Sequence, residues 1–351
     1  MCAALGLALA LACPTQAQRP FQTVPTKNQV VSTKNEAATF RNPLKTPGAD
    51  PWMTFHNGYY YLTTTTAVDV KMRRARRIGD LKTAPDIVVW KDEAPGRASA
   101  IWASEFHLLD GGNGPRWYLY YTAARPNNEG SHRLFVAESA GTDPLGPYTF
   151  KAQLKTDAED KHYAIDGTVL RLPNGELYQV WCGRPSAAGQ GIYIAKMSNP
   201  WTIDGPRTYL EASGFGCPNI REAPEILQRD GKIFLIYSMC GASTPDYRLS
   251  MLVADSKSNL LDPKSWRQHP KLLLARVDQR GVYGPGHNFF FKSPDEREDW
   301  IVYHTKTTTN DTYANRTTHA QKFTWNADGT PNFGLPLSTD EEIAAPSGEA
   351  R

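Results

Sequence analysis

Short apolar runs separated by clusters of Gly, Pro, Asn and Asp recur along the chain. Five runs rich in aromatic and β-branched residues stand out, at 59–66, 117–123, 177–183, 233–240 and 300–307. Such residues fit the half-buried surface of a pleated sheet. No stretch longer than a few turns has an apolar period of 3.6 residues, and Gly or Pro interrupts the chain about every ten residues. The pattern therefore predicts an all-β fold.

A turn signal precedes each run, which makes each run the second strand of a hairpin. The signals are Asn57-Gly58, residues 111–114, Asn174-Gly175, Asp230-Gly231 and residues 293–295. Asn-Gly and Asp-Gly favour tight hairpins because type I′ turns require positive φ. Successive runs begin 56 to 67 residues apart. Five hairpins at a nearly constant spacing indicate five copies of one β unit, and we expect a five-bladed β-propeller.

Ionisable residues occur in step with this repeat, just upstream of each hairpin turn. They are Asp50, Glu105, Asp166, Glu222 and His287. One such residue near a strand end is usually a solvated cap, so the alternative is that these residues face solvent separately. In a propeller, however, the innermost strands of all blades line one central channel. We therefore expect Asp50, Asp166 and Glu222 to surround a common pocket.

Three carboxylates in a pocket rich in aromatic residues suggest glycoside hydrolysis. That reaction needs a carboxylic acid to protonate the leaving oxygen and a carboxylate on the opposite face of the sugar. A neighbouring carboxylate raises the pKa of the acid, which gives a third acidic residue a function. Trp52, Trp102 and Phe106 lie beside the predicted centre and are candidate platforms for a sugar ring. The alternative for each of them is a place in the core.

The N-terminus has the features of an export signal. Residues 1–13 form an apolar run, shorter than the roughly 20 residues that span a bilayer. Small residues follow, and cleavage after Ala17 would leave a chain that begins at Gln18. No basic residue precedes the run, so a buried N-terminal helix is the alternative, and lipid attachment at Cys13 is a weaker one. We expect a secreted or periplasmic protein without a membrane span.

Net charge and cysteine spacing limit the classes of partner and ligand that we expect. The 351 residues carry a net charge of +3, which gives no reason to expect a nucleic-acid partner and fits an uncharged polysaccharide. Beyond the predicted signal lie Cys182, Cys217 and Cys240, which allow at most one disulfide and lack metal-ligand spacing. We expect them to be buried thiols.

The chain divides into four predicted parts. We expect a signal peptide at 1–17, a polar lead segment at 18–40, the propeller at 41–337 and a frayed C-terminal tail at 338–351. No internal linker separates two domains, so the length is better explained by one closed ring of five repeats than by two domains.

Four ordered motifs resemble glycoside hydrolase family 43. GADPW contains Asp50, AIDGTV contains Asp166, REAPEI contains Glu222 and GVYGPGHN contains His287; the resemblance extends from about residue 42 to 336. It implies a five-bladed propeller that acts with inversion on arabinose- and xylose-containing polysaccharides. It also implies that Asp50 is the general base, that Glu222 is the general acid, and that Asp166 tunes the pKa of the acid and orients it.

The resemblance also suggests roles for two further residues. His287 matches a family histidine that is often associated with a bound cation, commonly calcium, and the alternative is a buried, hydrogen-bonded histidine. Arg316 falls where the family tends to place a sugar-contacting arginine, and the alternative is a surface charge. No cofactor is expected for the chemistry itself.

Around the predicted acid, one competitor and two departures stand out. Glu225 lies three residues from Glu222, so in a regular strand the two point to opposite faces, and the resemblance favours Glu222. Ala223 replaces the glycine usual after the acid, and Ser104 replaces a usual proline. Neither departure removes a functional group.

Three segments indicate the substrate. Residues 197–207, 281–304 and 318–334 are most similar to exo-acting α-L-arabinofuranosidases that trim α-1,5-linked arabinan. We therefore expect arabinan of the plant cell wall as the substrate. A β-xylosidase is the first alternative, because it would share the catalytic centre. A carbohydrate-binding propeller without turnover and a retaining, fructan-processing propeller are the others.

Overall fold

The computed structural model describes residue 1 and residues 38–186, 189–339 and 341–350. Apart from Met1, the predicted signal peptide lies outside the described residues, as does the lead segment up to residue 37. In the described chain the helices are three short 3-10 turns, Ile78–Lys82 (η1), Pro263–Ser265 (η2) and Asp278–Arg280 (η3). Within these residues, no helix has the length and apolar character needed to cross a membrane.

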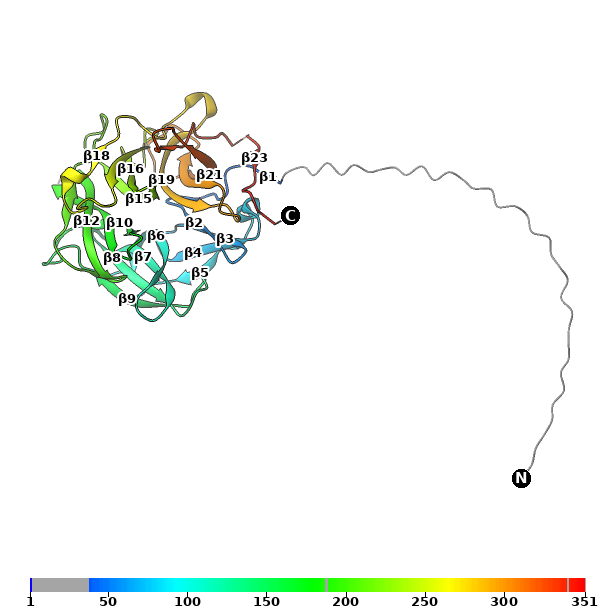
Figure 1. Ribbon diagram of the computed structural model, residues 1–351, viewed down its shortest axis with the longest axis horizontal. Helices are drawn as coiled ribbons and strands as arrows, with labels where there is room; N and C mark the ends of the chain where they lie inside the picture. Colours follow the sequence, from blue (N-terminus) through cyan, green and yellow to red (C-terminus); the bar gives the residue numbers. More distant parts are fainter. Residues whose placement is uncertain (2–37, 187–188, 340, 351) are drawn as a thin grey trace. The chain divides into compact units, whose positions relative to one another are not determined.

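Five antiparallel sheets, each built from consecutive strands, form the body of the protein (Figure 1). The first holds β2 (Trp52–His56), β3 (Tyr59–Thr65), β4 (Val70–Ala75) and β5 (Ile87–Trp90). The second holds β6 (Ser99–Asp110), β7 (Pro115–Arg125), β8 (Asn128–Ser139) and β9 (Tyr148–Leu154). The third holds β10 (Ala164–Arg171), β11 (Leu177–Ser186), β12 (Gly189–Asn199), β13 (Thr202–Ile203) and β14 (Thr208–Leu210). The fourth holds β15 (Arg221–Arg229), β16 (Lys232–Met239), β17 (Arg248–Asp255) and β18 (Arg267–Gln268). The fifth holds β19 (Tyr283–Lys292), β20 (Asp299–Lys306), β21 (Arg316–Trp325) and β22 (Pro331–Asn332).

The first strands of the five sheets contact one another in a closed ring. Strand β2 touches β6, β6 touches β10, β10 touches β15, β15 touches β19, and β19 returns to β2. This is the arrangement of blades around the axis of a propeller (Figure 1). The all-β, five-bladed fold expected from the hairpin repeat is confirmed, and each predicted second strand is the second strand of a blade.

Hydrophobic cores fill the spaces between neighbouring blades. Five large clusters of buried side chains each combine residues from two adjacent blades. The aromatic runs read from the sequence supply much of this volume, for example Tyr237, Trp300 and Tyr121, which are at most 1% exposed. Because each blade buries one face against the next, the ring has no open face between its first and last blades.

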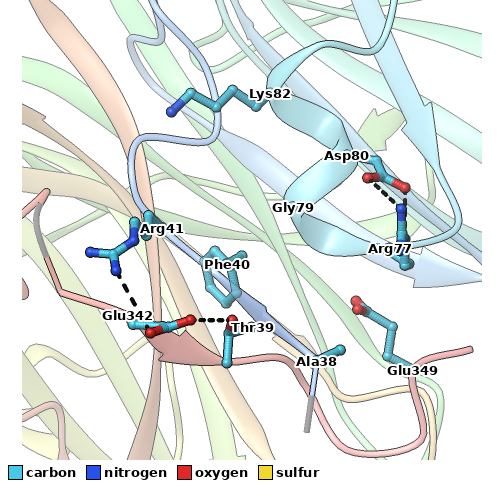
Figure 2. A pocket seen from close by; sticks show the side chains of 10 residues that line it. All are labelled: Ala38, Thr39, Phe40, Arg41, Arg77, Gly79, Asp80, Lys82, Glu342 and Glu349. Atoms are coloured by element: carbon cyan, nitrogen blue, oxygen red, sulfur yellow. Dashed lines mark hydrogen bonds and ion pairs between the residues drawn. The ribbon is translucent and has the colours of Figure 1, made fainter. Parts of the chain in front are cut away.

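The two ends of the described chain pair beside the seam between the fifth and first blades. Strand β1 (Thr39–Phe40) is antiparallel to β23 (Ile343–Ala344). Figure 2 shows the hollow of about 390 Å³ beside this pair, where Thr39 Oγ1 donates to Glu342 Oε1 at 2.6 Å. Phe40 and Ile343 are buried and join the core of this seam. The pair therefore covers the junction at which the ring closes.

The C-terminal segment corrects one expectation. Residues 338–351 read as a frayed tail, but the described part is held at several points. Glu349 Oε2 accepts a hydrogen bond from the Ile78 amide at 2.7 Å, and Ser347 Oγ donates to Asp295 Oδ1 at 2.6 Å. The polar composition of this segment gave no sign that it packs on the propeller. Its contacts are made by single side chains and by only two strand residues.

Two of the predicted hairpin turns have the expected backbone. Both residues of Asn57-Gly58 and of Asp230-Gly231 have positive φ, between 47° and 81°, as type I′ turns require.

The cysteines correct one expectation. Cys217 and Cys240 form a disulfide, so the expectation of buried thiols was wrong for these two. The two cysteines are 23 residues apart in the sequence, and the β15–β16 hairpin between them brings them together. Their spacing alone did not indicate this pairing. Cys182 is a buried free thiol.

Removing the aromatic side chain at the closing pair should destabilise the protein. Phe40 is 6% exposed, and its ring centroid lies 6.1 Å from that of Trp300. We expect Phe40→Ala to lower the free energy of unfolding, measured in urea, by about 3–5 kcal/mol. Phe150→Ala is the matched control, because Phe150 is 38% exposed and should cost less than half as much. Equal losses would contradict the role of this pair in closure.

Candidate active site

A β-bulge at the same place in four of the five blades shapes the site. In four inner strands the pairing with the next strand is irregular at one equivalent point, between Trp102 and Glu105, Ile165 and Thr168, Glu222 and Glu225, and Gly286 and Phe289. One residue at each of these points, and one just before β2, has a left-handed backbone with φ between 42° and 53°: Asp50, Ala103, Asp166, Ala223 and His287. Bulges redirect side chains and interrupt the ladder. The repeat therefore creates five equivalent positions at one end of the channel.

These positions refine the series of ionisable residues read from the sequence. Asp50, Asp166 and His287 occupy the left-handed position itself, whereas Glu222 lies one residue before it and Glu105 two residues after it. The residue after the bulge belongs to a deeper layer of the channel. Glu105 is consequently absent from the lining of the cavity that contains the other four.

A cavity of about 480 Å³ opens at this end of the channel. The three predicted catalytic carboxylates line it, and so do three other residues singled out from the sequence: Trp102, His287 and Arg316. Tyr163, Arg184 and Tyr313 contribute further wall. Six of the eight predicted site residues are thus brought together, from all five blades.

Asp50 is held ionised by a ring of basic groups. Arg316 Nη1 donates to Asp50 Oδ1 at 2.7 Å, and the Nδ1 atoms of His287 and His304 lie 3.2 and 3.3 Å from the same oxygen. Burial alone would raise the pKa of Asp50. The Arg316 guanidinium and the two imidazoles outweigh that effect and hold this pKa well below its usual range.

Glu222 and Asp166 are shifted in the opposite direction. Burial raises the pKa of Glu222 to about 7, against the hydrogen bond that Tyr247 Oη donates to Glu222 Oε1 at 2.9 Å. Burial, followed by the charges of Glu222 and Asp50, raises the pKa of Asp166 well above its ordinary value. Glu222 and Asp166 influence each other and therefore titrate as a pair. The cavity can hold one carboxylate and at least one protonated carboxyl at neutral pH.

The alanine that replaces the usual glycine keeps the backbone that a glycine would have. Ala223 has φ of 50°, in the left-handed region that glycine adopts without steric cost. Its amide donates to Asp166 Oδ2 at 3.0 Å, which joins the third and fourth blades directly beside Glu222. The methyl group of Ala223 therefore does not prevent the contact between the strand of Asp166 and the strand of Glu222.

A second polar layer lies beneath the cavity. His107 Nε2 is 2.9 Å from Glu105 Oε2, and Thr168 Oγ1 donates to Glu225 Oε2 at 3.4 Å. Burial raises the pKa of Glu105 to about 8 and that of Glu225 well above its ordinary value. Glu225, the competing candidate for the acid, is directed into this layer and is absent from the cavity lining, whereas Glu222 is part of it.

Two of the three aromatic residues proposed as sugar platforms are core residues. Trp52 and Phe106 are each 1% exposed, and their ring centroids lie 5.0 Å apart. Trp52 occupies the deeper layer, with Phe289 at 5.5 Å, because it follows the left-handed Asp50 by two residues. Both rings belong to the core between the first two blades. Trp102 does line the cavity, backed by the His132 ring at 4.0 Å.

The surroundings of His287 do not form an evident calcium site. Calcium prefers six to eight oxygen ligands, and the carboxylate in contact with His287 is Asp50, which is already bonded to Arg316. Among the residues that the structure describes, no group of three His, Cys, Asp or Glu side chains is arranged to hold a metal ion. Calcium near His287 stays a prediction, and no step below depends on it.

Two residues of the site were not anticipated. His304 lies directly opposite Gly286 in the last hairpin, so counting back from the turn at residues 293–295 would have placed it beside His287. Tyr247 lies just before β17, after an irregular stretch that follows β16. No sequence pattern positions such a residue, because the path of an irregular loop depends on its packing.

Comparisons with known proteins agree with this geometry. Residues 40–331 match the profile of Glycosyl hydrolases family 43. The chain is 36% identical, over 337 residues, to an extracellular exo-α-(1→5)-L-arabinofuranosidase of Streptomyces avermitilis; the match covers 90% of this chain and 67% of that protein. A Streptomyces chartreusis protein of the same name is 34% identical over 77% of this chain and 83% of its own length.

A solved structure has the same fold over nearly its whole length. The crystal structure of an α-L-arabinofuranosidase from Lactobacillus brevis matches with a TM-score of 0.77 and 33% identity. The match covers 86% of this chain and 98% of that one. The similarity therefore includes all the blades that line the cavity.

Replacing the arginine beside Asp50 should raise the pKa of that carboxyl. Arg316→Gln removes the guanidinium, so we expect the ¹³C carboxyl signal of Asp50 to titrate at higher pH than in the wild type. A carboxyl with a depressed pKa stabilises the fold above its unfolded-state pKa, and this stabilisation is lost as the pH falls through the folded-state pKa. In the variant this stabilisation should be smaller, and its loss should be complete at a higher pH.

Arg184→Gln is the matched control for this measurement. Arg184 lines the same cavity but stacks on Tyr163, with its guanidinium 4.0 Å from the ring centroid. It should move the Asp50 titration much less. Equal movement in the two variants would show that the direct Arg316 contact is not the cause.

Proposed function

Because the chain belongs to glycosyl hydrolase family 43, we propose that it is an inverting, exo-acting α-L-arabinofuranosidase that releases arabinose from arabinan or arabinose-decorated polysaccharide. The observation that carries the proposal is the charge state of the cavity. Asp50 is held ionised, while the pKa values of Glu222 and Asp166 are raised. Inverting hydrolysis needs this combination of a carboxylate and a carboxylic acid around one sugar.

Asp50 acts as the general base in this proposal. It takes a proton from water as the water oxygen attacks the anomeric carbon, on the face opposite the leaving group. The Arg316 guanidinium is the main group that keeps its carboxylate ionised, and contacts with Arg316, His287 and His304 restrict its orientation. A carboxylate whose position is fixed before the reaction needs little rearrangement in the transition state.

Glu222 acts as the general acid and transfers its proton to the glycosidic oxygen as the bond to the anomeric carbon breaks. A pKa of about 7 keeps much of it protonated near neutral pH, where an unshifted glutamate would be ionised. The charge of Asp50 also favours the protonated form of Glu222, and Asp166, whose own pKa is raised, titrates together with it. Each turnover ends with Asp50 protonated and Glu222 ionised, and exchange with water restores both.

The relatives support arabinose over xylose as the sugar. Two of them are named as exo-acting arabinofuranosidases that cleave α-(1→5) bonds, and the Lactobacillus brevis structure carries the same activity in its title. A solved xylan β-1,4-xylosidase structure from Bacillus halodurans matches at 18% identity, which indicates a common fold. A β-xylosidase would share the three carboxylates and differ in the cavity wall. The choice between arabinose and xylose therefore depends on the residues of the cavity wall.

The proposed site of action is outside the cytoplasm. The apolar run at residues 1–13 is the sequence feature that supports export, and the two Streptomyces relatives are named as extracellular. Arabinan is a polymer of the plant cell wall, so an enzyme that acts on it has to meet it there or on fragments imported into a periplasm.

Variants of the two proposed catalytic residues should depend differently on the leaving group. Glu222→Gln should lower kcat/KM on phenyl α-L-arabinofuranoside by about 10²- to 10⁴-fold, because phenoxide leaves poorly without a proton. It should lower the value far less on the 2,4-dinitrophenyl glycoside, whose leaving group needs no protonation. Asp50→Asn should reduce turnover of both substrates, because water attack is required in each case.

Glu225→Gln is the matched control for the acid. It changes a glutamate on the same strand that faces the buried layer, so its effect should be independent of the leaving group. Near-wild-type turnover of the phenyl glycoside by folded Glu222→Gln would remove Glu222 from the role of acid. A leaving-group dependence confined to Glu225→Gln would reassign that role.

The substrate and the stereochemistry can be tested together. We expect at least tenfold higher kcat/KM on an aryl α-L-arabinofuranoside than on the matching aryl β-D-xyloside, a difference of about 1.4 kcal/mol in transition-state stabilisation. Proton NMR during the reaction should show β-L-arabinofuranose as the first product. A preference for the xyloside would overturn the choice of sugar, and initial release of the α-anomer would overturn inversion. Binding of arabinan without release of arabinose would favour a carbohydrate-binding protein.

A further inference from the structure

We propose that Tyr247 is a positioning residue that directs the transferable proton of Glu222 to Oε2, because its hydroxyl donates a hydrogen bond to Oε1. This inference rests on the proposed role of Glu222 as the acid. It concerns a residue outside the three carboxylates and adds a fixed direction to the proton that they share.

The Tyr247 hydroxyl interacts with both Ser238 and Glu222. The His287 amide donates to Ser238 Oγ at 2.8 Å, and the Ser238 side chain acts on the Tyr247 hydroxyl to lower its pKa, against the effect of burial. Tyr247 Oη donates its hydrogen to Glu222 Oε1 at 2.9 Å. Ser238 and Glu222 are directly opposed in the β15–β16 ladder, so these side chains lie on one pair of strands. The amide fixes the place of the Ser238 hydroxyl, and the bond from Tyr247 fixes Oε1 of Glu222.

The ring of Tyr247 has little freedom to leave this place. Tyr247, Ser238 and His304 are each 0% exposed. One face of the Tyr247 ring stacks on His304, with centroids 5.3 Å apart and an angle of 5° between the planes. On another side it lies against Gly286, where an added Cβ would come within 2.4 Å of two ring carbons. A glycine is required there because the phenol fills the space of its side chain.

The stacking also joins the environments of the acid and the base. His304 Nδ1 accepts the Asp50 amide at 3.2 Å, while Tyr247 bonds to Glu222. The stacked His304 and Tyr247 side chains thus hold the backbone of Asp50 and the carboxyl of Glu222, respectively. Their contact restricts the relative placement of the two groups that act on opposite faces of a sugar.

An occupied Oε1 leaves Oε2 as the oxygen for the transferable proton. A carboxyl that accepts a strong hydrogen bond at one oxygen is protonated more readily at the other. The same bond stabilises the ionised carboxylate and so opposes the effect of burial on the pKa of Glu222. The other charged or titratable groups that act on Glu222 or are affected by it are Asp50, Asp166, Arg316, Tyr163, Cys182 and Tyr313.

The pH dependence of Tyr247→Phe tests this proposal. The variant keeps the ring and removes the hydroxyl, so the pKa of the acid should rise. We expect the alkaline limb of kcat/KM on phenyl α-L-arabinofuranoside to move up by about one pH unit. The plateau should fall about tenfold, and by much less on the 2,4-dinitrophenyl glycoside, because only the first substrate needs the proton. Ser238→Ala should move the limb in the same direction by a smaller amount.

Tyr237→Phe is the matched control. Tyr237 is another fully buried tyrosine of the fourth blade, and its hydroxyl donates to the Ser213 carbonyl at 2.7 Å and contacts Gln268 at 2.9 Å. Its loss should leave the alkaline limb unchanged even if the protein becomes less stable. An unmoved limb in Tyr247→Phe, or equal movement in both variants, would overturn the proposal.

A double variant separates this proposal from the proposed function. If Glu222 is the acid and Tyr247 acts through it, Tyr247→Phe should not lower kcat/KM on the phenyl glycoside any further in a Glu222→Gln background, which has no acid to titrate. If Glu222→Gln alone shows no leaving-group dependence, the assignment of the acid fails whatever Tyr247 does. If Glu222→Gln behaves as expected and Tyr247→Phe still lowers kcat/KM tenfold in its presence, only the role of Tyr247 is wrong.

Discussion

The repeated bulge in the inner strands is the constraint on which the site depends. A regular strand alternates its side chains, and a single carboxylate at its end would have no reason to meet those of other blades. A left-handed residue recurs in each blade, within the bulge in four of them and just before β2 in the first, which brings Asp50, Asp166 and His287 to one mouth. Left-handed residues other than glycine cost about 1–3 kcal/mol each. The five cores between the blades offset this cost and keep the positions fixed.

Charge in the cavity is divided by contacts and not by residue type. Asp50 and Asp166 have the same side chain and the same backbone conformation, yet their pKa values move in opposite directions. Arg316 bonds to Asp50, whereas Asp166 receives one backbone amide and the repulsion of its acidic neighbours. A buried site with several carboxyls can therefore hold an ionised base beside a protonated acid without any difference in the groups themselves.

Features that repeat along the chain could be predicted from the sequence. Features that depend on which face of a strand a residue occupies, or on the path of a loop, could not. Turn signals at fixed spacing identified the five blades and the three carboxylates. Trp52 was placed in the pocket although it lies in the core, because it follows the left-handed Asp50 by two residues and sequence alternation cannot detect that backbone change. Tyr247 and the pairing of Ile343 with Phe40 were beyond reach because they depend on where irregular segments pack. A resemblance to a family supplied what periodicity could not, namely separate roles for the carboxylates.

The Cys217–Cys240 bond has a consequence for where the protein becomes fully ordered. It links the segment just before Glu222 to the residue just after β16, and Gly241 and Ala242 beyond it line the cavity. Disulfides form and persist in oxidising compartments and are rare where thiols are kept reduced. A chain kept in a reducing compartment would lack this brace beside Glu222, and a chain in an oxidising compartment would have it. Maturation of the cavity is in this way coupled to the redox state of the compartment.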